Sequence, residues 1–171
     1  MTDSNIWTSK ESDIYRQLSA IAVPARADQI ATLLSLVPFN KNETFHAVEL
    51  ASGEGRLSYA LLDAFPNATV LALDFEESMR AETQSRLAHF AGRGKVDAFD
   101  MTQSNWYPLM KDADVILSSL CIHHLNAQGK QNLFQAVQTH LSNRGAFLIA
   151  DLVMPQRIQA REVFQATWDN M

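Results

Sequence analysis

The segment HAVELASGEGRLSYALL, residues 46–62, decides how the rest of the chain is interpreted. An apolar run ends near Glu49, a short turn contains Gly53 and Gly55, and a helical pattern of leucines follows. Glycines at a strand-to-helix turn let the backbone approach a ligand closely. The segment therefore predicts a ligand-binding loop at the end of a first strand, with acidic residues beside it.

The spacing within this loop argues against a dinucleotide ligand. A dinucleotide fingerprint needs G-x-G-x-x-G, so that a pyrophosphate meets the N-terminus of the following helix. When this turn is aligned with that pattern, the third glycine position holds Arg56 or Ser58. Two acids beside the loop, Glu49 and Glu54, would also repel a pyrophosphate. A cationic ligand, or one with an ammonium group, suits Glu49 better.

Length and composition narrow the class of protein. The 171 residues suit one domain, and a hydrophobic content of 47% is enough for a substantial core. The net charge of -5 argues against non-specific binding to nucleic acid or to an anionic membrane. The single cysteine, Cys121, excludes an intrachain disulfide and fits a reducing compartment. With a polar N-terminus and no apolar run near the ~20 residues that span a bilayer, we expect a soluble cytoplasmic protein.

Short apolar runs alternate with amphipathic segments through most of the chain. The runs are residues 45–50, 68–74, 95–100, 113–120 and 145–153. The helical candidates are residues 55–65, 77–91, 103–111, 127–142 and 156–170. Strands that alternate with helices predict βαβ units, a parallel sheet and right-handed crossovers.

Two helices are expected before the first strand. Ile14, Leu18 and Ile21 fall at helical spacing, and a second apolar stripe runs from Ile30 to Val37 before Pro38. The pattern predicts a helical cap over residues 1–38 and a ligand-binding domain over residues 39–171.

Two further acids end predicted strands and narrow the choice of ligand. Asp74 follows Gly53 by about 20 positions, where an acid accepts both hydroxyls of a ribose. Asp100 ends the third strand, where it can accept a hydrogen bond from an exocyclic amine. Phe75 and Met101 follow these acids and are placed to enclose an aromatic base. Acids for an ammonium, a ribose and an adenine amine together describe S-adenosylmethionine.

From about residue 44 to residue 153 the chain resembles the class I S-adenosylmethionine-dependent methyltransferases. The first motif of that family, an acid followed by x-G-x-G-x-G, is matched by Glu49-x-Ala51-x-Gly53-x-Gly55, with alanine at the first glycine. The family's ribose acid falls on Asp74 in LALDFEESM, and its adenine-side acid falls on Asp100 in DAFDM. DVILSSLCIHHL and GAFLIADLVMP resemble the fourth and fifth motifs.

The resemblance implies a fold, a cofactor and a reaction. The fold is a three-layer αβα Rossmann-like methyltransferase fold, with a parallel sheet in the order 3-2-1-4-5 that lacks the usual last two strands. The reaction is methyl transfer from S-adenosylmethionine to a small molecule by direct displacement, with S-adenosylhomocysteine as the product. The expected donor-binding residues are Arg26, Glu49, Ala51, Ser52, Gly53, Gly55, Asp74, Phe75, Met79, Asp100, Met101 and Ser118.

A histidine pair follows the fourth predicted strand, where substrate and donor would meet. A neutral imidazole of His123 or His124 can remove a proton from a hydroxyl or amine nucleophile. The alternative is that both histidines only cap or pack. No metal site is expected, because adjacent histidines tend to point apart and no third ligand is obvious. Cys121 is expected to be a small buried residue, since methyl transfer needs no enzyme nucleophile.

The resemblance stops after the fifth strand, where family members continue with a helix and two more strands. Residues 145–153 would then form an exposed apolar edge strand. Three explanations are open. The chain is a fragment, a second copy covers the edge by dimerisation or by exchange of the C-terminal helix, or a shortened protein has the edge covered by something else.

Other functions are weighed against methyl transfer. A non-catalytic protein could bind the donor without turnover, or could use the open sheet edge to bind a partner. A nicotinamide-dependent oxidoreductase is disfavoured by the glycine spacing. Nucleic-acid methylation is not supported, because the chain is acidic and lacks an Asn/Asp-Pro-Pro-Tyr/Phe motif for a flipped base. The expected partners are a small-molecule substrate and a second copy of the chain, with no nucleic acid and no membrane.

Overall fold

The computed structural model describes residues 25–153 and 155–169. The first predicted helix, with Ile14, Leu18 and Ile21, lies outside these residues. Among the helices within the two described ranges, none combines the length and the apolar character that crossing a membrane requires.

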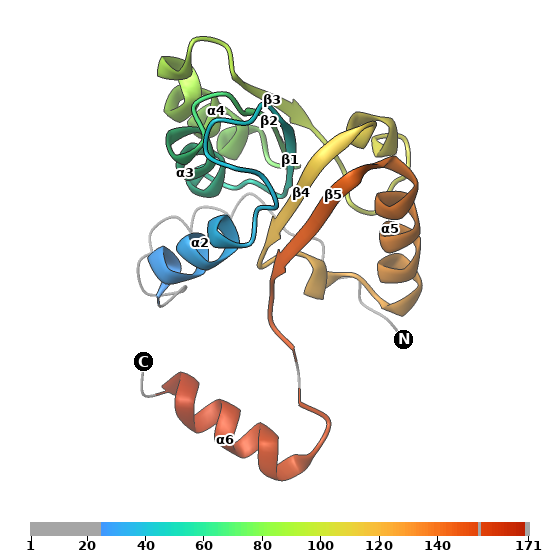
Figure 1. Ribbon diagram of the computed structural model, residues 1–171. Coiled ribbons are helices and arrows are strands. Elements are labelled where there is room, and N and C mark those ends of the chain that lie inside the picture. Colours follow the sequence, from blue (N-terminus) through green and yellow to red (C-terminus); the bar gives the residue numbers. More distant parts are fainter. Residues whose placement is uncertain (1–24, 154, 170–171) are drawn as a thin grey trace.

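Five parallel strands form one sheet (Figure 1). They are β1 (His46–Leu50), β2 (Thr69–Asp74), β3 (Gly94–Ala98), β4 (Ala113–Ser119) and β5 (Leu141–Ala150). Their order is β3-β2-β1-β4-β5, as predicted. The chain crosses over between β1 and β4, so the switch point of the sheet lies at the carboxyl ends of these two strands. In doubly wound sheets, ligands bind at this point.

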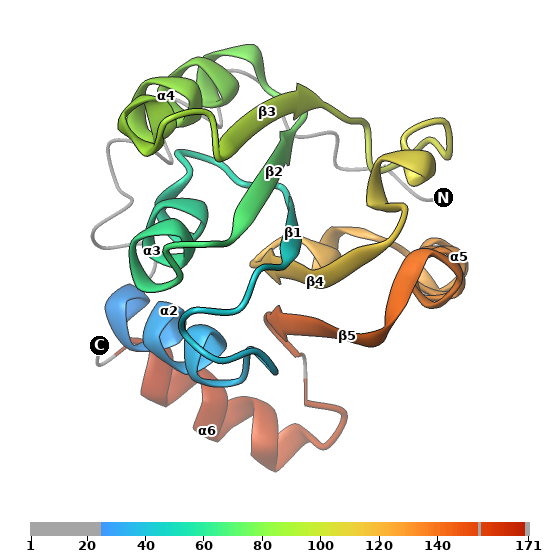
Figure 2. The same ribbon diagram turned by 45° about the horizontal axis from the view of Figure 1, so that its top comes forward.

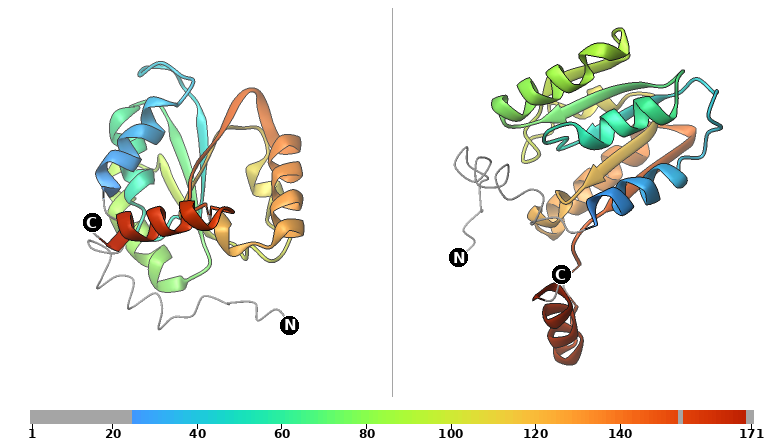
Figure 3. Two further views of the ribbon diagram at one scale, coloured as in Figure 1. Left: turned by 90° about the horizontal axis from the view of Figure 1, so that it is seen from below. Right: turned by 90° about the vertical axis from the view of Figure 1, so that its left-hand side faces the viewer.

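Helices cover both faces of the sheet and complete the three predicted layers (Figures 2 and 3). One layer contains α2 (Arg26–Ser35), α3 (Arg56–Ala64) and α4 (Glu77–Leu87), and the other contains α5 (Ala127–His140). Three short 3-10 helices, η1 (Ala88–Phe90), η2 (Tyr107–Met110) and η3 (Ile122–His124), lie in the connections. A last helix, α6 (Ile158–Asp169), follows β5 and lies apart from these layers.

Alternating side chains divide the core into two clusters. Ala47, Val115 and Leu117 face the layer of α2, α3 and α4, whereas Val48 and Ile116 face α5. All five side chains are completely buried. Strands covered on both faces need nearly continuous apolar sequence, which explains the long apolar runs of β1 and β4. Leu33 of α2 belongs to the first cluster, so α2 packs on the same core as α3. The predicted division of the chain into a helical cap and a ligand-binding domain after residue 38 stays a prediction.

Both ends of β5 differ from the prediction of a strand over residues 145–153 because of strand pairing. β5 begins at Leu141, opposite Ala113, and an irregularity follows before the regular ladder resumes at Ala146. It ends at Ala150, which is opposite the last residue of β4, Ser119. Residues 151–153, predicted as strand, lie beyond the last paired residue of β4 and pair with no strand among the described residues.

Candidate functional site

The loop after β1 folds back onto the end of β2. Ala51, Gly53 and Gly55 have positive φ angles of 57°, 54° and 73°, so every second residue of the loop has a left-handed backbone conformation. The Ser52 N–H donates to the carbonyl of Leu73 (2.9 Å), and the Gly55 N–H donates to the carbonyl of Ser52 (2.8 Å). The loop is therefore a closed turn whose backbone is held against the neighbouring strand.

The two glycines of this loop have different surroundings. A Cβ atom built on Gly55 would lie 2.7 Å from a side-chain carbon of Thr83, so Gly55 permits close packing of the loop on α4. A Cβ atom built on Gly53 would meet nothing within 4 Å, so space is open above it. Thr83 also donates its hydroxyl to the Gly53 carbonyl (2.8 Å), and Arg86 donates to the Glu54 carbonyl (2.7 Å). Helix α4 thus supports the loop from behind while Gly53 faces a cavity.

Asp74 is held in place by backbone donors at the end of β2. The Gly53 N–H donates to Oδ2 (2.7 Å), and the Glu76 N–H donates to Oδ1 (3.0 Å). Burial raises the pKa of Asp74, and these two hydrogen bonds oppose the increase. Each carboxylate oxygen has further acceptor capacity, so the fixed carboxylate can also receive hydrogen bonds from a ligand.

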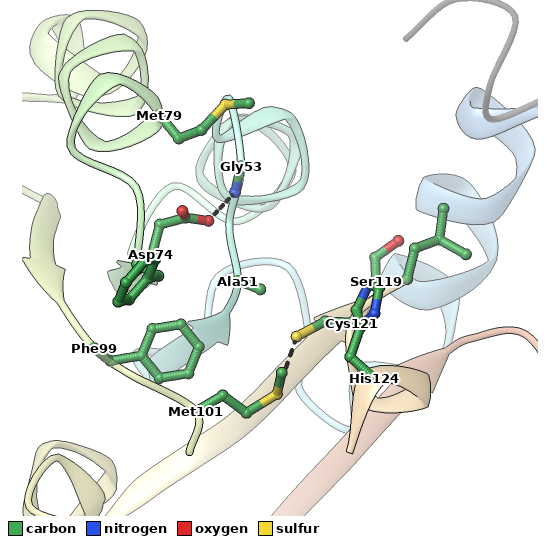
Figure 4. Close-up of a pocket in the computed structure, with 11 residues that line it drawn as sticks. Ala51, Gly53, Asp74, Met79, Phe99, Met101, Ser119, Cys121 and His124 are labelled. Atoms are coloured by element: carbon green, nitrogen blue, oxygen red, sulfur yellow. Dashed lines mark hydrogen bonds between the residues drawn. The ribbon is translucent and has the colours of Figure 1, made fainter. Parts of the chain in front are cut away.

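The main cavity lies beyond the carboxyl ends of the strands (Figure 4) and has a volume of about 160 Å³. In Figure 4, Asp74 and Gly53 meet on one side, and residues of the β4–α5 connection lie opposite them. Most of its wall is apolar. The lining residues are Ala51, Gly53, Asp74, Phe75, Met79, Phe99, Met101, Ser119, Leu120, Cys121 and His124.

A smaller, more polar cavity adjoins the main one and shares Ala51, Gly53 and Ser119 with it. Arg26 of α2 and Glu49 of β1 line this polar cavity. So does Ser52, whose buried hydroxyl has no hydrogen-bond partner among the described residues. Together, the two cavities provide an apolar chamber with one fixed carboxylate and an adjacent chamber with mixed charges.

His123 and Asp151 form a pair at the ends of β4 and β5. The Nδ1 atom of His123 lies 2.5 Å from Oδ1 of Asp151, and the His123 N–H donates to Oδ2 (3.0 Å). An ionised carboxylate only accepts hydrogen bonds, so Nδ1 carries the proton and Nε2 is left as the basic nitrogen. The sequence reasoning missed Asp151, although the rule that identified Asp74, an acid at the end of a parallel strand, applies to it equally.

The structure brings most of the predicted donor-binding residues to the two cavities, but three line neither. Of the predicted catalytic pair, His124 lines the main cavity and His123 lines neither. Gly55 packs against α4, and Ser118 is completely buried within β4. Asp100 accepts hydrogen bonds from the backbone and the hydroxyl of Thr102. The cavity is lined instead by Phe99 and Ser119, neighbours of Asp100 and Ser118, which the sequence did not identify as donor-binding residues. The roles predicted for Gly55, Ser118 and Asp100 stay predictions.

Cys121 lies in the wall of the main cavity as an unreactive thiol. Burial raises its pKa to about 12, so the nucleophilic thiolate is scarce near neutral pH. Its sulfur lies 3.4 Å from the sulfur of Met101, across the cavity wall. These features agree with the expectation of a small buried residue.

Comparison with known protein families decides the classification. A sequence model described as a methyltransferase domain matches residues 47–145. The chain belongs to this methyltransferase domain family. The matched region extends from β1 into β5 and includes the loop, Asp74 and the histidine pair, whereas Arg26 and Asp151 lie outside it. A search of curated proteins finds no match.

Solved methyltransferase structures share this fold. An O-methyltransferase family protein from Burkholderia thailandensis is 19% identical with a TM-score of 0.63, over 86% of this chain and 41% of that one. Mitomycin 7-O-methyltransferase is 18% identical with a TM-score of 0.66, over 93% and 44%. A methyltransferase from Thiobacillus denitrificans, in complex with S-adenosylhomocysteine, is 15% identical with a TM-score of 0.63, over 90% and 61%. This methyltransferase-domain chain therefore spans less than half the length of the first two.

Proposed function

We propose that this methyltransferase-domain chain binds S-adenosylmethionine and transfers its methyl group to a small molecule. The observation that carries the proposal is the Asp74 carboxylate, which Gly53 and Glu76 hold at the rim of an apolar cavity. A ribose needs such a fixed acceptor, and an adenine ring needs the apolar wall beside it. The S-adenosylhomocysteine bound to the structural neighbour from Thiobacillus denitrificans supports the same ligand class.

The residues of the two cavities match the parts of the donor. Asp74 would accept the ribose hydroxyls, and Phe75, Phe99 and Met101 would enclose the adenine. The polar cavity would hold the amino-acid end, with Glu49 toward the ammonium and Arg26 toward the carboxylate. The open space above Gly53 and the buried hydroxyl of Ser52 fit a ligand that passes from one cavity to the other.

When bound, S-adenosylmethionine supplies a methyl group activated by its sulfonium. The chain would contribute proximity and orientation, because the two cavities would hold both ends of the ligand and the apolar wall would exclude water. The positive charge disappears during transfer, so acids near the sulfur would stabilise the ground state more than the transition state. We therefore assign Glu49 and Asp74 to binding and orientation rather than to the chemical step.

We assign His123 as the general base, with Asp151 as the residue that positions it, because its ring centroid lies 4.0 Å from that of His124 in the wall of the main cavity. Nδ1 of His123 is occupied by Asp151, so Nε2 would receive the proton of a hydroxyl or amine acceptor. His124, in the cavity wall, would contact the substrate instead. A base held in this way favours acceptors that must lose a proton before or during methylation.

Titration of the protein with S-adenosylhomocysteine in a calorimeter tests the donor assignment. We expect saturable binding to one site per chain, and no comparable binding of NAD, because the third glycine of its fingerprint is absent. A folded protein that binds NAD but not S-adenosylhomocysteine would make the chain an oxidoreductase candidate. Donor binding without turnover of any acceptor would favour a non-catalytic donor-binding protein.

Replacing Ala51 by glycine should tighten donor binding. Ala51 lies at the junction of the two cavities with a φ angle of 57°, a region that costs a non-glycine residue about 1–2 kcal/mol. Ala51→Gly removes the methyl group from the junction, and we expect the S-adenosylhomocysteine Kd to fall about threefold to tenfold if this methyl costs ~1 kcal/mol of contact.

Ala91→Gly is the matched control for that substitution. Ala91 follows η1 with a φ angle of 53° and lines neither cavity. Its thermal stability should change as much as that of Ala51→Gly, because both variants relieve the same backbone conformation, while its Kd should stay at the wild-type value. Equal affinities of the two variants would show that the Ala51 methyl group does not meet the donor.

A further inference from the structure

We propose that donor binding expels a proton from Glu49, so that cofactor occupancy falls as the pH drops below neutrality. The inference rests on the proposed function and adds regulation to the same site. The proton leaves to solvent, and the carboxylate that remains pairs with the ammonium of the donor.

The position of Glu49 leaves its carboxyl with little solvation. β1 is the central strand, paired with β2 on one side and β4 on the other, and the Glu49 side chain is only 2% exposed. Ser58, in the first turn of α3, donates its hydroxyl to Oε2 and its backbone N–H to the same carboxyl. Glu49 also lines the polar cavity, so a ligand that enters this cavity would lie next to the residue.

Two charges of opposite sign act on this carboxyl. Arg26 of α2 favours the carboxylate, and Asp74 of β2 disfavours it. Glu54 and Arg56, also in the wall of the polar cavity, pair with each other at 2.9 Å. The neighbouring strand β4 contributes only uncharged Ser119 to this cavity. Burial is the largest effect and raises the pKa of Glu49 to about 7.

A cationic ligand beside Glu49 shifts the protonation equilibrium of its carboxyl toward the charged carboxylate. Near pH 7 a substantial fraction of the free protein carries a protonated Glu49, whereas an ammonium beside the carboxyl favours the charged form. Binding therefore lowers the pKa of Glu49 and releases a proton wherever the free carboxyl was protonated. Affinity rises with pH up to about 7 and then levels off. If the carboxylate of the ligand faced Glu49 instead, affinity would fall as pH rises.

The experiment compares two ligands by calorimetry between pH 5.5 and 7.5, in buffers with different enthalpies of ionisation. S-Adenosylhomocysteine contains the α-ammonium, and 5′-methylthioadenosine has the same adenosine and thioether but no amino-acid end. For S-adenosylhomocysteine we expect about tenfold tighter binding at pH 7.5 than at pH 5.5, with release of about one proton at the lower pH. 5′-Methylthioadenosine should bind without this dependence, which also controls for titration of Asp74 and His124, because it reaches the same main cavity.

Two variants assign the effect to Glu49. Glu49→Gln cannot release a proton, so its affinity for S-adenosylhomocysteine should not vary over this range. Ser58→Ala removes one hydrogen bond that favours the carboxylate, so the midpoint of the dependence should move to higher pH.

Each outcome has a distinct meaning. If S-adenosylhomocysteine binds the wild type with the same affinity at every pH, or if the affinities of both ligands change equally with pH, the inference is overturned and the proposed function stands. If neither ligand binds the folded protein, the donor assignment itself is wrong.

Discussion

Replacement of Asp74 by alanine is expected to weaken S-adenosylhomocysteine binding by about 100-fold or more. The variant would lose the two hydrogen bonds that the carboxylate accepts from the ribose, and hydrogen bonds to a charged group contribute about 1.5–3 kcal/mol each. The loop would also lose an anchor, because the Gly53 N–H donates to the same carboxylate. Calorimetric titration measures the loss, and a thermal melt checks that the variant remains folded.

Asp100→Ala is the matched control. Asp100 also follows a strand of the same sheet, but its Oδ1 accepts hydrogen bonds from Thr102 and the side chain lines neither cavity. We expect its Kd to stay within about threefold of wild type, as for a substitution that removes no ligand contact. A large effect at Asp100 would confirm its predicted contact with the adenine, and unchanged affinity at Asp74 would refute the ribose assignment.

Replacement of His123 by alanine is expected to lower the methylation rate by about 100-fold to 10,000-fold, the usual contribution of a general base. Donor affinity should hardly change, because His123 lies outside both cavity walls. The measurement is formation of S-adenosylhomocysteine from S-adenosylmethionine with a panel of phenols and primary amines. Asp151→Asn should retain part of the rate, since its side chain can still contact the imidazole but no longer selects the tautomer through a charge.

The choice of acceptor separates a base from a structural residue. A nitrophenol that is already ionised at the assay pH needs no base, so His123→Ala should methylate it almost as fast as the wild type does. A structural defect would slow every acceptor equally. His124→Ala is the control variant. His124 lines the cavity, so its loss should change the KM of the acceptor. An ionised phenol should not restore the activity of His124→Ala as it restores that of His123→Ala.

Much of the fold could be predicted from the alternation of short apolar runs with helical patterns. The strand order was implied by the resemblance to the class I methyltransferases rather than by the alternation itself. Ala47 and Val48 illustrate why the runs are apolar throughout, since they face opposite helical layers. The ends of the elements were less predictable. β5 ends at Ala150 because its partner Ser119 is the last residue of β4, and that pairing is invisible in either segment alone.

Part of the candidate site could likewise be predicted from the sequence, and part of it could not. The loop, Glu49 and Asp74 were identifiable because parallel strands bring their carboxyl ends to one edge of the sheet. The choice between Asp100 and its neighbour Phe99 was not, because a strand that ends can turn either side chain toward the cavity. Pairing of His123 with Asp151 was also hidden, because it joins residues from two different strand ends.

The sequence by itself determined the alternation of strands and helices, the class of loop and the acids at the strand ends, because these depend on residue type and spacing along the chain. The sheet order was an expectation from the family resemblance, and the structure confirms it. Only the tertiary structure decided which of those acids face a cavity, which glycine faces open space and which imidazole nitrogen of His123 contacts Asp151. It also decided the acidity of Glu49: burial in the central strand and the opposing charges of Arg26 and Asp74 set the pKa near neutrality. Solvation and pairing of a side chain depend on what surrounds it in space, and those neighbours come from distant parts of the chain.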